Sequence, residues 1–310
     1  MDWIWRKMAN PRLIRKRVNS IKNIGKITKA LEMVSASKVQ RAQDKAMSAK
    51  PYARTIYELI ANLADDSEAS EIALMRRPLK IANDLFILIT TNRGLAGSLN
   101  TNLLHELSDR LSAKVANHSF VTIGKKGRAF AARHGKLEAD YSDNKNLQGN
   151  VSALTRFIID GFTEGKYDEV NVVYNNFVNA LNQEPVIKKL LPITKEELES
   201  QEPGKVFELI EKSNGTEKVT DRTNVNYYYE PNAVTVLKDL LPYYLEILIT
   251  ESIYEADASE HSARMIAMKN ASDNASELSD ALSLEYNKSR QSLITTEISD
   301  ITTAQAALSD

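Results

Sequence analysis

Two glycine-containing turns are the positions in this chain where phosphate chemistry could take place. Gly94-Leu-Ala-Gly97 follows a short apolar run, and Gly124-Lys-Lys-Gly127 follows another. The amino ends of helices attract anions because their backbone N–H groups are free to donate. Neither turn, however, has the spacing G-x-G-x-x-G or G-x-x-x-x-G-K-[ST] of the nucleotide-binding motifs. We therefore interpret both as tight strand-to-helix turns that hold no nucleotide.

The residue types that bind metals or act as nucleophiles are absent or scattered. The chain has no cysteine, and its four histidines are far apart. It contains neither an H-E-x-x-H pair for zinc nor a G-x-S-x-G nucleophile turn. Carboxylates are numerous, but none is distinguished as an acid–base pair. The sequence predicts no catalytic residue, no metal and no cofactor in this chain.

The turns belong to a region in which short apolar runs alternate with amphipathic stretches. Such alternation is typical of a parallel or mixed α/β sheet. The predicted strands and helices are, in chain order, 84–90, 98–114, 119–124, 125–133, 147–165 and 170–174. The segment 193–229 contains Pro203, Gly204 and Gly215 and predicts a hairpin or a surface excursion.

Both ends of the chain predict helices much longer than those of a small domain. Residues 243–310 contain neither glycine nor proline, and the same is true of residues 26–50. Without these helix breakers, the C-terminal run could extend about 100 Å. We expect an N-terminal coiled-coil helix at 1–66, a central α/β domain at 67–232 and a C-terminal coiled-coil helix at 233–310.

Charge and apolar patterns predict that the two terminal helices pair in an antiparallel coiled coil. Nine Lys or Arg and no acidic residue lie between 3 and 31, whereas twelve Asp or Glu and four Lys or Arg lie from 243 onward. Opposite charges beside a seam select the partner and its orientation. If both helices have equal rise, the numbers of facing residues should add up to about 298. The predicted core residues recur every three to four positions: Val18, Ile21, Ile24, Ile27, Leu31, Val34, Met265, Met268, Ala275, Leu278 and Leu282.

Two other classes of protein are compatible with parts of these patterns. A basic helix could belong to a helical-arm protein that binds nucleic acid, although the acidic C-terminal helix argues against this class. A small α/β nucleotide-binding enzyme is disfavoured by the missing phosphate motifs. No apolar run approaches the ~18 residues of a membrane-spanning helix, and the first residues do not resemble a signal peptide.

Three blocks of sequence resemble the gamma subunit of F-type ATP synthases. They begin at Ile24, Ser259 and Tyr286 and read IGKITKALEMVSASK, SEHSARMIAMKNASDNA and YNKSRQSLITTEI. Shorter matches occur at Arg93-Gly-Leu-Ala-Gly97 and Tyr229-Glu-Pro231. The blocks occur in the order of the family and extend over nearly the whole chain.

The resemblance implies the fold and the role of that family. Terminal helices would form an antiparallel coiled coil inside a hexamer of alpha and beta subunits, and a Rossmann-like α/β foot would rest with the epsilon subunit on the c-subunit ring. One copy per complex would act as the non-catalytic rotor shaft of a proton-translocating ATP synthase, peripheral to the membrane, with no nucleic-acid partner. Since no long transit segment precedes the first block, we expect the cytoplasmic face of a bacterial inner membrane.

The resemblance also assigns contacts to individual residues. Arg93 is similar to the arginine that meets acidic residues of a beta C-terminal domain. Arg290 and Gln291 resemble the pair that hydrogen-bonds a beta loop higher on the shaft. Tyr229 and Glu230 are expected where the foot meets the c ring.

Overall fold

The computed structural model describes residues 11–63, 72–76, 78, 81–113, 116–142, 148–194 and 229–309. Its contacts form two compact units: one combines residues up to Ser35 with those from Met265 onward, and the other runs from Ala36 to Arg264. Most of the excursion expected at 193–229 lies outside the described residues.

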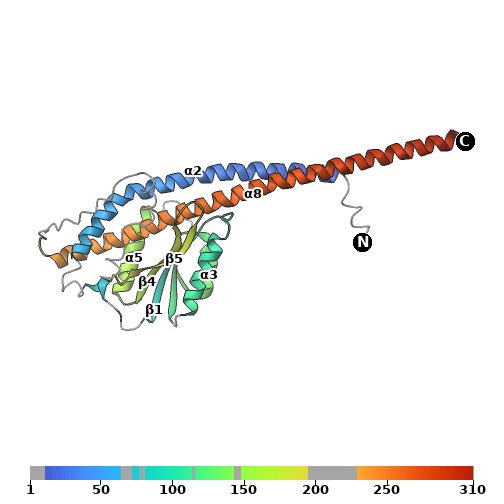
Figure 1. The fold of residues 1–310 in the computed structure, drawn as a ribbon. Helices are drawn as coiled ribbons and strands as arrows, with labels where there is room; N and C mark the ends of the chain where they lie inside the picture. Colours follow the sequence, from blue (N-terminus) through green and yellow to red (C-terminus); the bar gives the residue numbers. More distant parts are fainter. Residues whose placement is uncertain are drawn as a thin grey trace. The chain divides into compact units, whose positions relative to one another are not determined.

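A five-stranded mixed sheet forms the centre of the unit from Ala36 to Arg264 (Figure 1). The strand order is β3-β2-β1-β4-β5; the first four strands of this order are parallel, and β5 is antiparallel to β4. In register, Phe86 of the central strand lies beside Phe120 and Asn171. The strands are β1 (Asn83–Ile89), β2 (Asn117–Ile123), β3 (Lys136–Asp140), β4 (Glu169–Phe177) and β5 (Gln183–Leu191).

Helices cover both faces of the sheet, with α3 and α5 on opposite sides in Figure 1. Alternate side chains of a strand point to opposite faces, so Phe86 packs with Leu103 and Leu107 of α3, whereas Leu85 joins a larger core that includes Ile158 of α5. The helical elements are η2 (Ala73–Met75), α3 (Leu99–Ser112), α4 (Lys125–His134), η3 (Gln148–Asn150) and α5 (Val151–Thr163).

The predicted alternation of strands and helices is confirmed, but β3 and β5 were not predicted. Both are edge strands of the sheet. An edge strand tolerates charged residues and proline because one side of its backbone needs no partner. β3 accordingly reads Lys-Leu-Glu-Ala-Asp, and β5 contains Pro185 and two lysines, so neither shows a continuous apolar run.

The long terminal helices are also confirmed, as α2 (Pro11–Leu63) and α8 (Ala233–Ser309). The described part of α2 starts at Pro11. The side-chain oxygen of Asn232 accepts a hydrogen bond of 2.8 Å from the backbone nitrogen of Thr235 and thereby caps α8. Of the helices that the structure describes, none is both long and apolar enough to cross a bilayer.

Small and polar side chains alternate with a few large apolar ones between α2 and α8 in the unit that these helices form. A Cβ atom placed on Gly25 would lie 3.5 Å from the Cβ of Ala275. The numbers of these facing residues add up to 300, close to the predicted value. The buried residues of this unit are Ile14, Val18, Thr28, Ser35, Met268 and Ser279.

Four predicted core residues do not lie in this seam. Ile24, Ile27, Val34 and Leu278 expose 52%, 60%, 53% and 50% of their surfaces, respectively. From Val18 and Ile21 the seam continues to Gly25 and Thr28, one position beyond the large apolar residues that the prediction selected. A seam is set by spacing of three and four residues along the helix, and small side chains can occupy it. The remaining predicted core residues are buried (Val18 and Met268) or half-buried (Ile21, Leu31, Met265, Ala275 and Leu282).

We expect cysteines introduced at Gly25 and Ala275 to form a disulfide in the full chain. Their Cβ atoms would be 3.5 Å apart, within the range of about 3.5–4.5 Å that a disulfide requires. The natural chain has no cysteine that could compete. Mild oxidation followed by non-reducing electrophoresis and peptide mass spectrometry measures the yield.

The matched control pairs Gly25→Cys with Leu278→Cys, because Leu278 is half exposed and lies outside the seam. This pair should crosslink much less. Equal yields from the two pairs would show that the seam is assigned to the wrong residues.

Candidate functional site

The glycine turn after β1 presents Arg93 on a backbone that is fixed by hydrogen bonds. Thr91 Oγ1 donates to the carbonyl oxygen of Arg93 at 2.7 Å, and Asn100 Nδ2 donates to Thr91 Oγ1 at 2.8 Å. Leu95 has a φ of 66°, which is unusual for leucine, and is largely exposed. The Arg93 side chain is exposed as well, so the turn offers one cation and one apolar group to a partner.

Arg264 of α8 binds the same turn from the other side. Its Nη2 donates to the carbonyl oxygens of Arg93 and Gly94 at 3.4 Å and to Glu260 Oε1 at 2.7 Å. The Arg264 side chain is only 11% exposed, and a charge-assisted hydrogen bond is stronger than one between neutral groups. Arg264 therefore helps to hold the Arg93 turn. No pattern in the sequence indicates this contact, because the two partners are 171 residues apart.

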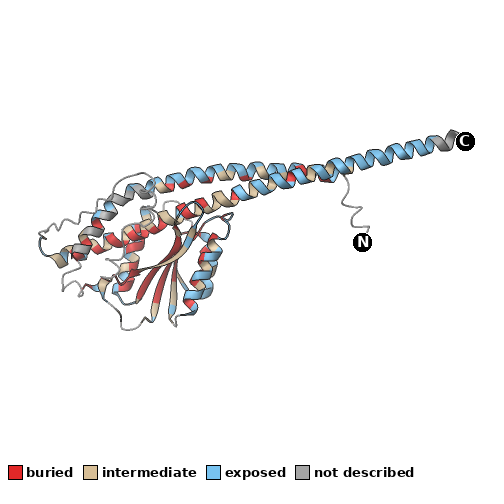
Figure 2. Ribbon diagram, viewed as in Figure 1, coloured by how far each residue is buried: buried red, intermediate tan, exposed pale blue. Residues whose placement is uncertain are grey.

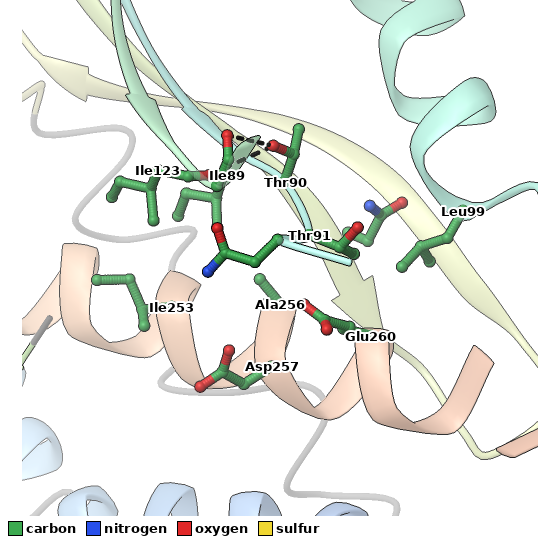
Figure 3. A pocket seen from close by; sticks show the side chains of 12 residues that line it. Ile89, Thr90, Thr91, Leu99, Ile123, Ile253, Ala256, Asp257 and Glu260 are labelled. Atoms are coloured by element: carbon green, nitrogen blue, oxygen red, sulfur yellow. Dashed lines mark hydrogen bonds between the residues drawn. The ribbon is translucent and has the colours of Figure 1, made fainter. Parts of the chain in front are cut away.

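A cavity of about 200 Å³ lies beside this turn, between α8 and the ends of β1 and β2. Figure 3 shows Thr90 and Thr91 after β1 on one side of it and Asp257 and Glu260 of α8 on the other. Its polar lining also includes Asn92 and Asn175, and its apolar lining consists of Ile89, Leu99, Ile123, Ile253 and Ala256.

Asp257 and His261 of α8, near the cavity, have strongly shifted pKa values. The surrounding protein, and then the Glu260 carboxylate, raise the pKa of Asp257 to about 6, with partial opposition from Lys45 and Lys38. Asp257 is nevertheless exposed to solvent, which weakens the effect of the surrounding protein on its pKa. Burial lowers the pKa of His261 to about 4, assisted by nearby cations. At neutral pH Asp257 is therefore ionised in a place that disfavours its charge, and His261 is neutral.

We expect Asp257→Asn to stabilise the chain above pH 6 and to leave its stability unchanged below about pH 4. Folding raises the pKa of Asp257 from 3.8 to about 6, so ionised Asp257 destabilises the folded state. This destabilisation is absent below the lower value, grows between the two and is complete above the higher one. Thermal melting followed by circular dichroism between pH 4 and 8 measures the difference.

Asp273→Asn, which removes an exposed carboxylate on the same helix, serves as the control and should show no such pH window. A loss of stability in Asp257→Asn at pH 8 would contradict a raised pKa of Asp257 in the folded chain.

Among the residues that the structure describes, no helix faces the part of α8 that carries Arg290 and Gln291. Since facing residues add up to 300 at Gly25 and Ala275, Pro11 at the start of α2 faces Ser289. Every described side chain from Arg290 to Gln305 is exposed (Figure 2). This stretch also exposes the apolar residues Leu293, Ile294, Ile298 and Ile301. Exposed apolar residues that recur along a helix indicate a surface that another protein covers.

The remaining predicted contact residues precede α8. Tyr229 is half-buried and packs against the large core of the α/β unit, whereas Glu230 is exposed. Arg93 belongs to the same unit, while Arg290 and Gln291 belong to the unit formed by α2 and the end of α8. The predicted contacts are thus distributed over both units.

Comparison with known sequences shows similarity along nearly the entire chain. The profile of the family described as ATP synthase matches residues 10–308. The ATP synthase gamma chain of Roseiflexus sp. (strain RS-1) is 40% identical over 312 residues, covering 98% of this chain and 100% of the relative. The ATP synthase gamma chain of Desulfitobacterium hafniense (strain DSM 10664 / DCB-2) is 38% identical over 307 residues, covering 97% and 100%.

Comparison with solved structures shows the same fold. A chain of the Euglena gracilis mitochondrial ATP synthase (OSCP/F1/c-ring, rotational state 3) superposes with a TM-score of 0.61 at 21% identity, covering 96% of this chain and 94% of that chain. A chain from the central stalk and c-ring of the Tetrahymena thermophila mitochondrial ATP synthase gives a TM-score of 0.56 at 22% identity, covering 79% and 99%. The predicted fold class, a central α/β sheet with long terminal helices, is confirmed.

Proposed function

This chain belongs to the ATP synthase gamma chain family, and we propose that it is the central rotor shaft of an F-type ATP synthase. The observation that carries the proposal is similarity to gamma chains along the full length of this chain and of its relatives. The shaft turns with the c ring, and its asymmetric surface moves the catalytic beta subunits through their conformations. Such coupling requires contacts that differ between the conformations of beta.

The partners of the shaft are the alpha and beta subunits of the hexamer, the epsilon subunit and the c ring, with one copy of this chain per complex. The helix boundaries support the division into 1–66, 67–232 and 233–310, since α2 ends at Leu63 and α8 begins at Ala233. We place the chain at the cytoplasmic face of a bacterial inner membrane as a peripheral subunit, a location supported by its similarity to bacterial gamma chains.

Arg93 contacts acidic residues of the C-terminal domain of a beta subunit in this proposal. Its planar guanidinium can form two parallel hydrogen bonds to one carboxylate. The turn that carries it is held by Thr91 and Arg264. The backbone of this turn therefore loses little conformational entropy when Arg93 binds a partner. Arg290 and Gln291 contact a beta loop from the exposed end of α8, and Tyr229 and Glu230 contribute where the foot meets the c ring.

The chemistry of ATP synthesis takes place on beta, and this chain transmits torque. In the parts of the chain that the structure describes, no group of three or more His, Cys, Asp or Glu is placed to hold a metal. The two glycine turns lead directly into α3 and α4 and lack the nucleotide motifs.

Affinity purification from cells that express a tagged copy of this chain tests the proposal. Two larger proteins should copurify, each in threefold molar excess, and the purified complex should hydrolyse ATP. The chain separated from these partners should be inactive. Recovery of the tagged chain without such partners, or ATP turnover that stays with the isolated chain through repeated purification, would refute the rotor assignment.

A further inference from the structure

The last segment of α8 within the α/β unit lacks the large apolar side chains that hold the preceding part of this helix. From Glu255 to Arg264, where the unit ends, the sequence reads EADASEHSAR, and its only apolar residues are alanines. Contacts other than a core of large apolar residues must therefore hold α8 where it leaves the unit. In the preceding part, by contrast, the helix contributes to the large core the buried residues Tyr244, Leu245, Leu248, Ile249 and Ile253.

Two buried serines of this segment bond to backbone oxygens outside α8. Ser259 Oγ donates to the carbonyl oxygen of Asn175 in β4 at 2.9 Å. Ser262 Oγ donates to the carbonyl oxygen of Ala180, in the turn between β4 and β5, at 2.7 Å. Both serines are completely buried. A serine within a helix often bonds instead to the carbonyl oxygen four residues earlier, as Ser283 does at 2.7 Å. Ser259 and Ser262 thus connect the helix to the sheet.

The turn that contains Ala180 is itself fixed by hydrogen bonds. Asn179 Oδ1 accepts hydrogen bonds from the backbone nitrogens of Leu181 and Asn182, both at 2.8 Å. The backbone nitrogen of Asn179 donates to the carbonyl oxygen of Asn182 at 3.1 Å. An Asn side chain that bonds the backbone two residues further on stabilises a turn. Ser262 therefore bonds to a turn that moves little when a force acts on α8.

The hydrogen bonds that hold this segment lie on two sides of α8. Ser259 and Ser262 are three residues apart and share one face of the helix. Arg264 is about 200° around the helix from Ser262, and it donates to the carbonyl oxygens of Arg93 and Gly94 at 3.4 Å. Hydrogen bonds depend on direction, whereas apolar contacts do not. Rotation of α8 about its axis would therefore break hydrogen bonds that an apolar contact could not replace.

We propose that Ser259 and Ser262, together with Arg264, lock α8 against rotation where it leaves the α/β unit, and that this lock carries torque between the foot and the shaft. The inference rests on the function proposed above and names the residues of this chain through which the load passes. Because α8 is one helix from Ala233 to Ser309, a twist of the α/β unit reaches the remainder of α8 through this segment. The three are positioning residues, since none of them touches a reacting group.

The load on the shaft distinguishes this role from a purely structural one. During ATP synthesis the c ring drives the foot, and the lock carries the full torque to the shaft. When ATP hydrolysis turns the shaft and the proton gradient is collapsed, the foot follows against little resistance, so the lock carries little load. A weakened lock should therefore lower ATP synthesis far more than unloaded hydrolysis, whereas a misfolded foot or shaft would lower both.

The double variant Ser259→Ala with Ser262→Ala, in the purified complex reconstituted into lipid vesicles, tests the proposal. Each substitution removes only the hydroxyl oxygen. ATP synthesis driven by an imposed proton gradient and ATP hydrolysis in the presence of an uncoupler are measured on the same preparation. We expect the ratio of synthesis to hydrolysis to fall by about threefold or more, because two buried hydrogen bonds are lost. Each single variant should show a smaller fall, and it carries the test if the double variant does not assemble.

Ser283→Ala is the matched control, because it makes the same substitution on α8 but removes a hydrogen bond of 2.7 Å that stays within the helix. Its ratio of synthesis to hydrolysis should equal that of the wild type. An unchanged ratio in the double variant, including the case in which synthesis and unloaded hydrolysis fall together, would overturn the lock. If the chain does not copurify with its larger partners, the rotor assignment itself is refuted, and this inference with it.

Discussion

Gly124→Ala is expected to lower the free energy of unfolding by about 3–5 kcal/mol, or to prevent folding altogether. Gly124 has a φ of 97°, and a Cβ at this position would lie 1.9 Å from the carbonyl oxygen of Thr90 and 2.6 Å from its carbonyl carbon. These are backbone atoms at the end of the central strand, and Thr90 is held there by a hydrogen bond of 2.7 Å from its backbone nitrogen to the oxygen of Ile123. Neither side can move without breaking the β1–β2 pairing.

Urea unfolding of the purified chain measures this loss, and Gly94→Ala is its control. Nothing lies within 4 Å of a Cβ at Gly94, and its φ is not in the left-handed region, so this variant should stay within about 0.5 kcal/mol of the wild type. If Gly124→Ala unfolds at the same urea concentration as Gly94→Ala, Gly124 does not lie against the backbone of Thr90 as the structure has it.

The structure gives these glycines the role that their sequence context indicated. Gly124 immediately precedes α4, and the backbone nitrogen of Gly127 donates to Thr90 Oγ1 at 2.9 Å. Backbone N–H groups at the start of α4 are thus partly bonded to the protein itself. They are less available to bind a phosphate, in agreement with the missing phosphate motif. The turn could be predicted because a helix start is set by local sequence.

The seam of the coiled coil could be predicted only in part. Apolar periodicity identified both helices and the approximate register, because these depend on the repeat and on the rise per residue. The periodicity gave the wrong residues at Ile24 and Ile27. There the prediction selected the large apolar side chains, whereas the seam runs through the neighbouring Gly25 and Thr28. Hydrophobicity alone does not show whether a large apolar residue faces its own partner helix or another surface.

The contacts around the Arg93 turn could not be predicted from the sequence. Arg264 reaches the turn because α8 packs across the ends of the strands, and no local pattern encodes a contact over 171 residues. The cavity at Asp257 depends on the same packing. The resemblance to a family identified Arg93, whereas only the structure shows what holds its backbone.

Replacing Arg290 and Gln291 together with alanine should slow ATP hydrolysis and synthesis by the assembled complex by about tenfold. Hydrogen bonds to charged groups contribute about 1.5–3 kcal/mol, and each 1.36 kcal/mol added to a barrier is a factor of about ten in rate. The full effect appears only if the contact with beta exists at the rate-limiting rotor angle and not at the preceding one, because equal binding at all angles changes no barrier. Steady-state turnover of the purified complex, with and without a proton gradient, measures it.

The same double variant should leave assembly and shaft stability unchanged, since both side chains are exposed in the described part of the chain. Arg290→Lys separates charge from geometry: a lysine retains the charge but cannot reproduce the two parallel hydrogen bonds of a guanidinium, so most of the loss should remain. Lys288→Ala removes an exposed cation about 200° around the same helix and should have little effect. A double variant that assembles normally and turns over at the wild-type rate under load would show that these residues do not transmit torque. The coupling would then have to pass through the other exposed arginine that the fold holds in place, Arg93, whose turn Arg264 supports.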